Sequence, residues 1–164
     1  MTEQILLGKR VLVVDDEKDV LELLISLLGM CKIDAASSFE EAKNLLESNR
    51  YDVAVLDIMG VNGFELLKIA TERNIPALML TAWALNEESL EKSVQNGACY
   101  FVPKDEIGRI ETYVADVLEA VEKRQNPWTR WLKRLGGNFD VIFTGPEWRE
   151  RQRDLMEKLK RTGW

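Results

Sequence analysis

Apolar and polar residues follow two different patterns along roughly the first three quarters of the chain. Short apolar runs rich in β-branched residues predict buried strands at residues 9–15, 32–37, 51–57, 77–82 and 98–104. Apolar residues at helical spacing predict helices at residues 16–30, 38–46, 64–73, 86–96 and 106–124. Strands that alternate with helices are joined by right-handed crossovers and form a parallel sheet with helices on both faces. We therefore expect an α/β fold with a doubly wound, five-stranded parallel sheet in the strand order 2-1-3-4-5.

Three carboxylates stand where two neighbouring strands of this sheet end. Asp15 and Asp16 follow the first strand, and Asp57 ends the third. Strands one and three are neighbours at the point where the strand order reverses, and doubly wound sheets bind their ligands there. Three anions at one edge call for a divalent cation, and carboxylate oxygens suit Mg²⁺.

Two further polar residues reach the same edge. Thr81 closes strand four, and Lys104 closes strand five. A metal ion beside an ammonium and a hydroxyl suits a phosphoryl group, because the two cations neutralise its oxygens and the hydroxyl donates a hydrogen bond. Asp57 is then the candidate nucleophile, which would form an aspartyl phosphate. The sequence contains no histidine, so the chemistry cannot use the commonest general base.

Each of these residues also has a simpler interpretation. Asp15 and Asp16 could cap the first helix, since carboxylates are favourable at a helix amino terminus. Thr81 could be an ordinary strand residue, and Lys104 could be a solvated loop lysine. The presence of Asp57 on the adjacent strand favours the metal site over these readings.

The charge distribution divides the chain into two parts. The whole chain has 164 residues and a net charge of −6, which argues against nucleic-acid binding by the chain as a whole. Residues 1–124 hold 13 basic and 23 acidic side chains, whereas residues 125–164 hold 9 and 5. We therefore expect a boundary between a domain at residues 8–124 and an extension at residues 125–164.

The cysteines and the hydropathy point to the cytoplasm. Cys31 and Cys99 begin predicted strands, and we expect them to be small buried thiols and not a disulfide. No secretory signal is recognisable, and no apolar run approaches the roughly 18 residues of a membrane span. We therefore expect a cytoplasmic location and no membrane partner.

Four segments at strand ends resemble the signatures of the receiver domain of two-component response regulators. They read VVDDE at 13–17, VLDIM at 55–59, LTA at 80–82 and GACYFVPK at 97–104. Each motif is weak alone, but four in the right order make a specific signal. The resemblance covers about residues 8–124 and implies a flavodoxin-like fold. It also implies that the partner is a sensor histidine kinase or a phosphotransfer protein, whose phosphohistidine supplies the phosphoryl group.

The resemblance assigns roles to the acids. Asp57 would accept the phosphoryl group. Mg²⁺ would be bound by Asp16, Asp57 and the backbone carbonyl of Met59, with Asp15 acting mostly through water.

The resemblance also implies a switch. Thr81 and Lys104 would hold the phosphoryl group, and Phe101 matches the aromatic switch position, although a buried strand could equally hold it as ordinary core. Phosphorylation of Asp57 would draw Thr81 inward and repack Phe101. The face formed by helix four, strand five and helix five would then bind a partner or a second copy of the chain.

The chain departs from the family's pattern in its loops. The turn after Asp57 is shorter than usual and lacks a proline. Asp105 follows Lys104 where the family usually has proline, so the family's cis peptide is not carried over to this position. Met59 and Trp83 occupy positions that influence loss of the phosphoryl group to water. Because both are bulky and apolar, we expect slow self-dephosphorylation.

A second class of function could use the same residues. A Mg²⁺-dependent phosphatase or phosphotransferase would turn over small phosphorylated substrates through an aspartyl phosphate. Such a phosphatase usually has a second acid two residues after the nucleophile, and that position holds Met59. This difference favours a switch, so we do not expect turnover of a separate substrate.

The C-terminal extension is expected to be mainly helical. Apolar residues at helical spacing predict a short helix at 127–135 that ends at Gly136-Gly137, an extended piece at 138–144 and a final helix at 145–160. The extension lacks the helix-turn-helix pattern of a DNA-binding effector domain. We expect it to dock on the receiver or to form a dimer contact through its tryptophans. Contact of its basic side chains with nucleic acid or an acidic partner is the alternative.

Overall fold

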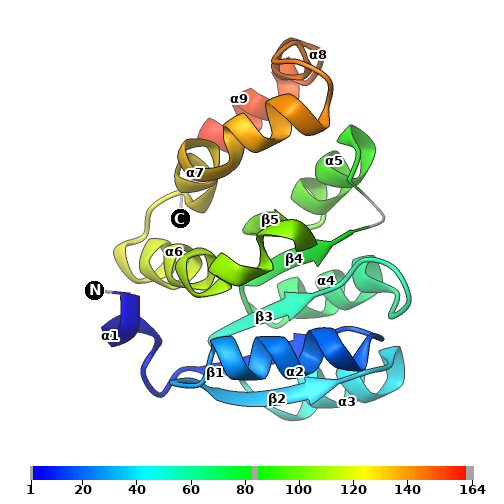
Figure 1. Cartoon of the computed structure of the whole chain (residues 1–164), viewed down its shortest axis with the longest axis vertical. Coiled ribbons are helices and arrows are strands. Elements are labelled where there is room, and N and C mark those ends of the chain that lie inside the picture. The colour runs from blue at the N-terminus through cyan, green and yellow to red at the C-terminus, as the bar shows by residue number, and fades with distance from the viewer. Residues whose placement is uncertain (1, 83–84, 162–164) are drawn as a thin grey trace.

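The centre of the molecule is a five-stranded parallel sheet (Figure 1). The computed structural model describes residues 2–82 and 85–161. Its strands are β1 Arg10–Val14, β2 Lys32–Ala36, β3 Val53–Leu56, β4 Ala77–Thr81 and β5 Tyr100–Pro103. Their order, β2-β1-β3-β4-β5, confirms the topology expected from the sequence.

Helices cover both faces of this sheet. The helices α2 Lys18–Leu27 and α6 Ile110–Lys123 contact each other on one face, and α3 Phe39–Ser48, α4 Gly63–Glu72 and α5 Glu87–Gln95 follow one another on the other (Figure 1). A 3₁₀ helix, η1 Lys104–Arg109, joins β5 to α6. Among the helices of the described residues, none has the length and apolar character needed to cross a membrane.

Burial and register explain how the sheet places the acids. The strands β3, β4 and β5 are buried at every position, which is why they read as unbroken apolar runs. In the pairing of β1 with β3, Val14 lies opposite Leu56. Asp15 and Asp57, which follow these two residues, therefore leave the sheet side by side at its carboxyl edge.

Local hydrogen bonds fix the start of α3, as the pattern of Ser38 and Glu41 suggests. The Ser38 hydroxyl accepts a hydrogen bond from the backbone N–H of Glu41 at 3.3 Å. The Glu41 carboxylate accepts one from the backbone N–H of Ser37 at 2.8 Å. The first bond satisfies a backbone donor that the first turn of a helix leaves free, and the second ties the residue before the N-cap to that turn.

A short N-terminal helix, α1 Thr2–Leu6, was not expected from the sequence, because five residues are too few to show a helical period. It packs against α6, and its Leu6 is fully buried. The Leu6 carbonyl accepts a hydrogen bond from the Cys31 thiol at 3.4 Å. Cys31 and Cys99 are both free thiols, Cys99 buried and Cys31 partly so, and burial raises the pKa of Cys99 to about 12.

The C-terminal segment is helical, but its helices differ from those predicted. It forms α7 Pro127–Ile142, α8 Trp148–Arg151 and α9 Arg153–Arg161. The prediction that the first helix ends at Gly136-Gly137 before an extended piece was wrong, and so was that of a single final helix, which is interrupted at Gln152. The two glycines cost the helix only about 1 kcal/mol each, which burial of its apolar face outweighs.

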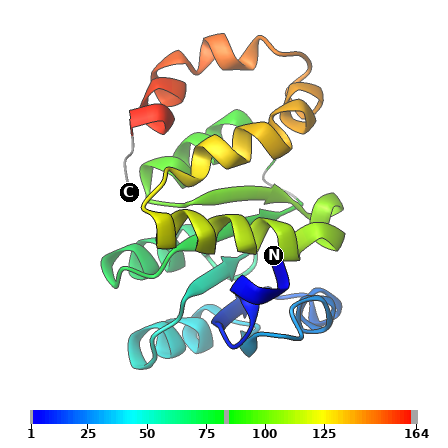
Figure 2. The same cartoon turned by 90° about the vertical axis from the view of Figure 1, so that its left-hand side faces the viewer.

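The segment docks on the rest of the chain. In Figure 2, α7 runs beside α6 and along β5, the strand at the edge of the sheet. Docking, the first of the two expectations for this extension, is what the structure contains.

Candidate functional site

Three acidic side chains gather at the carboxyl end of β1. Oxygen atoms of Asp15, Asp16 and Glu17 all lie within 4.8 Å of one another. Asp15 is buried, whereas Asp16 and Glu17 are exposed. Glu17 is the N-cap residue of α2, and its side chain makes no capping hydrogen bond in the described structure. Instead, Asp15 accepts a hydrogen bond from the backbone N–H of Glu17 at 2.9 Å.

Lys104 connects these acids to Asp57. Its Nζ lies 2.8 Å from the Asp15 carboxylate and 3.4 Å from those of Asp57 and Glu17. Its side chain is only 12% exposed, so the interpretation as a solvated loop lysine was wrong. The peptide between Lys104 and Asp105 is trans, and Lys104 reaches the acids from the first position of η1.

Burial shapes the electrostatics of this group. It raises the pKa of Asp57 to about 6, assisted by the negative charge of Asp15 and opposed by Lys104. Burial likewise raises the pKa of Asp15, against the effect of its bond to Lys104. For Lys104, burial lowers the pKa, but the bond to Asp15 and the charge of Asp57 outweigh it and leave the pKa raised. Two buried carboxylates thus share one ammonium, and the site has an excess of negative charge.

Thr81 supplies a hydroxyl at the same edge. It is the last residue of β4 and is fully buried. Within the described part of the chain, its Oγ1 has no hydrogen-bond partner. A buried hydroxyl without a partner is costly, so a group that accepts its hydrogen bond would relieve this cost.

These residues fit a magnesium ion and a phosphoryl group. Carboxylate oxygens are the ligands that Mg²⁺ prefers, and the acids outnumber the nearby cation. The Lys104 ammonium and the free Thr81 hydroxyl are donors of the kind that phosphoryl oxygens accept from. Of the expected site residues, Asp15 and Asp57 both contact the Lys104 ammonium.

The short turn after Asp57 packs tightly against the acids. Gly60 has a φ of +83°, and a Cβ atom on it would lie 2.3 Å from the Asp16 carboxylate. A Cβ atom on Gly63 would lie 1.9 Å from the Asp57 backbone oxygen. The Met59 side chain, directly before Gly60, is 54% exposed. Trp83, the other expected influence on phosphoryl loss, lies outside the described residues.

Phe101 lies in β5, two residues before the strand ends at the carboxyl edge of the sheet. It is fully buried on β5, and its ring centroid is 5.6 Å from that of Phe139 in α7. Phe101 is therefore covered by α7, and its role as the switch residue stays a prediction. Sequence reasoning missed this contact, and it assigned no site role to Glu17. The adjacent acids were the available signal for Glu17.

A comparison with protein families decides what this arrangement is. Residues 11–115 match the response regulator receiver domain. The chain belongs to this family. Receiver domains are signalling modules of two-component systems, and the family binds Mg²⁺ at an acidic pocket.

Known proteins similar to this receiver support the assignment. The chain is 35% identical over 103 residues to the two-component response regulator ARR18 of Arabidopsis thaliana, which covers 59% of this chain and 16% of that protein. It is 45% identical over 76 residues to the heme response regulator HssR of Staphylococcus aureus, covering 43% and 34%. The matched region thus spans about a third or less of these relatives.

Solved structures agree with the fold. A CheY-like receiver domain protein from Methanospirillum hungatei matches with a TM-score of 0.65 at 24% identity, covering 71% of this chain and 98% of that one. The receiver domain of the Francisella response regulator 1452 matches with a TM-score of 0.62 at 26% identity, covering 70% and 99%. Both cover nearly all of the solved chain but not the whole of this one.

Proposed function

We propose that Asp57 accepts a phosphoryl group from the phosphohistidine of a sensor kinase or a phosphotransfer protein in the cytoplasm. The observation that carries the proposal is the Lys104 ammonium held between the buried carboxylates of Asp15 and Asp57. The unpartnered Thr81 hydroxyl at the same edge of the sheet supports it. The phosphoacceptor unit is residues 8–124, with residues 125–164 as an extension.

The transfer is a single displacement. An Asp57 carboxylate oxygen forms a bond to phosphorus as the bond from phosphorus to the histidine nitrogen breaks, and the released imidazole keeps that electron pair. Lys104 neutralises charge on the transferred oxygens, and Thr81 donates a hydrogen bond to one of them. Asp16, Asp57 and the Met59 carbonyl would hold Mg²⁺, with Asp15 acting mostly through water; the ion, when bound, offsets the negative charge of the phosphoryl oxygens.

The output is a change in the face formed by α5, β5 and α6. Thr81 moves toward the phosphoryl group and Phe101 repacks, which alters what this face binds. A partner protein or a second copy of the chain is the proposed ligand. Because α7 lies on this face, either ligand has to bind over α7 or displace it.

Labelling by a small phosphodonor tests the proposal. The full chain is incubated with acetyl phosphate, with and without Mg²⁺, and phosphoryl incorporation is measured by intact mass and peptide mapping. We expect about one phosphoryl group per chain, on Asp57, only with Mg²⁺. Many turnovers per chain would instead indicate a phosphatase, and an unlabelled chain would overturn the phosphoacceptor role.

Gly60→Ala tests whether the turn positions Asp16. The left-handed backbone alone costs about 1–2 kcal/mol for alanine, and the new Cβ atom would displace the Asp16 carboxylate. We expect lower stability in urea unfolding and weaker Mg²⁺ binding in a calorimetric titration. Gly108→Ala is the matched control, since a Cβ atom there meets nothing within 4 Å. Unchanged Mg²⁺ affinity in Gly60→Ala would refute a ligand role for Asp16.

Self-dephosphorylation should be slow. In this family the positions of Met59 and Trp83 influence loss of the phosphoryl group to water, and both residues are bulky and apolar. Chains labelled at Asp57 and freed of phosphodonor should retain the label for minutes at neutral pH. Met59→Asn should shorten this lifetime, because a small polar side chain can hold a water. Loss of the wild-type label within seconds would contradict the expectation.

A further inference from the structure

The C-terminal segment seals the exposed edge of the sheet. The residues of α7 that face β5 are almost wholly buried: Trp128, Trp131, Leu135 and Phe139. The Trp131 indole N–H donates to the Phe101 carbonyl at 2.7 Å, and that of Trp128 donates to the Ala98 carbonyl at 3.1 Å. An edge strand presents unpaired backbone groups that invite another chain; the Trp131 indole bonds one carbonyl of β5, and the Trp128 indole bonds one just before the strand begins. The segment therefore takes the place of an external ligand.

The same helix holds Phe101 in place. The Phe101 ring lies against Phe139, whose centroid is 5.1 Å from that of Trp131. The ring and the carbonyl of Phe101 are thus both in contact with α7. An outward movement of the ring would break these contacts, so docking of α7 stabilises the buried position.

Strand register relates Phe101 to Thr81. In the pairing of β4 with β5, Met79 lies opposite Phe101 and Thr81 lies opposite Pro103. Because side chains two residues apart point to the same face of a sheet, Thr81 and Phe101 lie on one face as diagonal neighbours. Both are fully buried, so a movement of Thr81 toward Asp57 leaves a space that the ring of Phe101 is positioned to fill.

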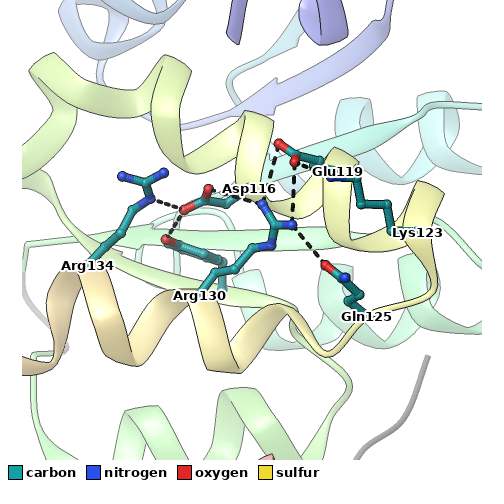
Figure 3. Close-up of polar contacts among 7 residues, drawn as sticks. Asp116, Glu119, Lys123, Gln125, Arg130 and Arg134 are labelled. Carbon is teal, nitrogen blue, oxygen red and sulfur yellow. Dashed lines mark hydrogen bonds and ion pairs between the residues drawn. The ribbon is translucent and has the colours of Figure 1, made fainter. Parts of the chain in front are cut away.

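An ionic cluster around the buried Asp116 fastens α7 to α6 (Figure 3). Asp116 is only 2% exposed, and it accepts a hydrogen bond from the Tyr100 hydroxyl at 2.7 Å. The guanidinium of Arg134 binds the same carboxylate, and that of Arg130 lies 3.8 Å from it and 3.4 Å from Glu119. Both arginines come from α7. Undocking would separate the Asp116 carboxylate from both guanidinium groups, so these ion pairs favour the docked position of α7.

A second ion pair joins α8 to α5 but contributes less. The Arg151 guanidinium binds both carboxylate oxygens of Glu87 at 2.9–3.3 Å. Arg151 is 51% exposed, and water screens the attraction within such an exposed pair, so it stabilises docking only weakly. The aromatic contact with Phe101 and the cluster around Asp116 therefore dominate docking.

We propose that residues 127–161 are the resident ligand of the face formed by α5, β5 and α6, and that their docking and phosphoryl occupancy of Asp57 stabilise each other. Docking of the segment and phosphoryl occupancy of Asp57 both favour the buried position of Phe101. Whichever occurs first therefore stabilises the position of Phe101 that the other requires. The coupling rests on the phosphoacceptor role of Asp57. This coupling makes the segment part of the switch. A partner that competes for the same face has to displace the docked segment.

Beryllium fluoride with Mg²⁺, a non-covalent mimic of a phosphoryl group on a carboxylate, tests the coupling in the full chain. Its affinity is measured by calorimetry, and docking of α7 is measured by amide hydrogen exchange of residues 127–142. In the wild type, we expect the probe to slow exchange in this helix. Phe139→Leu, which removes the ring contact with Phe101, should weaken probe binding by about 3- to 10-fold.

Matched variants separate coupling from general damage. Arg134→Gln weakens the cluster at Asp116 and should therefore also lower the affinity for the probe. Lys133→Gln removes the same charge from an exposed position and should leave the affinity unchanged. Val141→Ala, at an 80% exposed position of the same helix, should also bind as the wild type does.

Failure of the coupling can be distinguished from failure of the proposed phosphoacceptor role. Wild-type affinity in both Phe139→Leu and Arg134→Gln, or faster exchange in α7 on addition of the probe, would overturn the coupling while leaving the phosphoacceptor role intact. A wild-type chain that binds no probe and accepts no phosphoryl label would overturn the proposed function, and the coupling with it.

Discussion

Asp57→Asn is expected to abolish phosphoryl labelling and, at the same time, to stabilise the fold. The amide has no nucleophilic carboxylate oxygen, so no acyl phosphate can form. The stabilisation follows from the surroundings, because Asp57 and Asp15 are both buried and share the ammonium of Lys104. Asp57→Asn removes one of these two negative charges and so relieves the repulsion between them. The residue needed for function is therefore one that the fold tolerates at a cost.

The raised pKa of Asp57 gives the size and the pH dependence of this effect. A shift from 3.8 to about 6 corresponds to roughly 3 kcal/mol, of which burial of the amide cancels a part, leaving a gain of about 1–2 kcal/mol at pH 7. The folded state binds the proton more tightly than the unfolded state, so the wild type loses stability as the pH rises from about 4 to about 6. Asp57→Asn should lack this part of the decline.

Urea unfolding between pH 4 and pH 8 measures this effect, and mass spectrometry measures the label. Asp105→Asn is the matched control, because it changes an exposed carboxylate next to Lys104. It should keep the label and change stability by less than about 0.5 kcal/mol. A less stable Asp57→Asn chain at pH 7 would contradict the electrostatic account, and a labelled one would contradict the choice of acceptor.

Trp131→Ala is expected to lower the free energy of unfolding by about 4 kcal/mol. Trp131 is fully buried, and its ring packs against those of Trp128, Phe139 and Trp148. The substitution leaves a cavity among these rings and removes the donor to the Phe101 carbonyl. Such a loss would be a large fraction of the stability of a chain of this size.

Chemical unfolding monitored by circular dichroism measures this loss. Tryptophan fluorescence is less suitable, because the substitution itself changes the signal of the remaining tryptophans. Val141→Ala serves as the control from the exposed side of the same helix and should stay within about 0.5 kcal/mol of the wild type. A loss below about 1 kcal/mol for Trp131→Ala would mean that α7 is loosely attached, and would weaken the case for a resident ligand.

The sequence by itself determined the sheet and the contents of its carboxyl edge. Buried strands of a parallel sheet read as apolar runs, and the chain order of strands and helices leaves few topologies. Once the order is known, the residues that follow β1, β3, β4 and β5 have to meet. This is why the sequence alone predicts that Asp15, Asp57 and Lys104 lie close together.

Only the tertiary structure decided what covers the sheet edge. The apolar face of α7 indicated that the helix is buried, but a periodic pattern does not identify the surface that buries it. Gly136 and Gly137 suggested a helix end because their local preference is weak for helix, and packing against β5 overrode that preference.

The same distinction applies to individual residues of the site. Phe101 was identified from its motif, whereas its contact with Phe139, 38 positions further along the chain, depends on how α7 folds back. Local sequence fixes periodicity, capping and strand ends, because these depend on neighbours along the chain. Contacts between distant segments depend on the shapes of both surfaces, which the linear pattern of one segment does not contain.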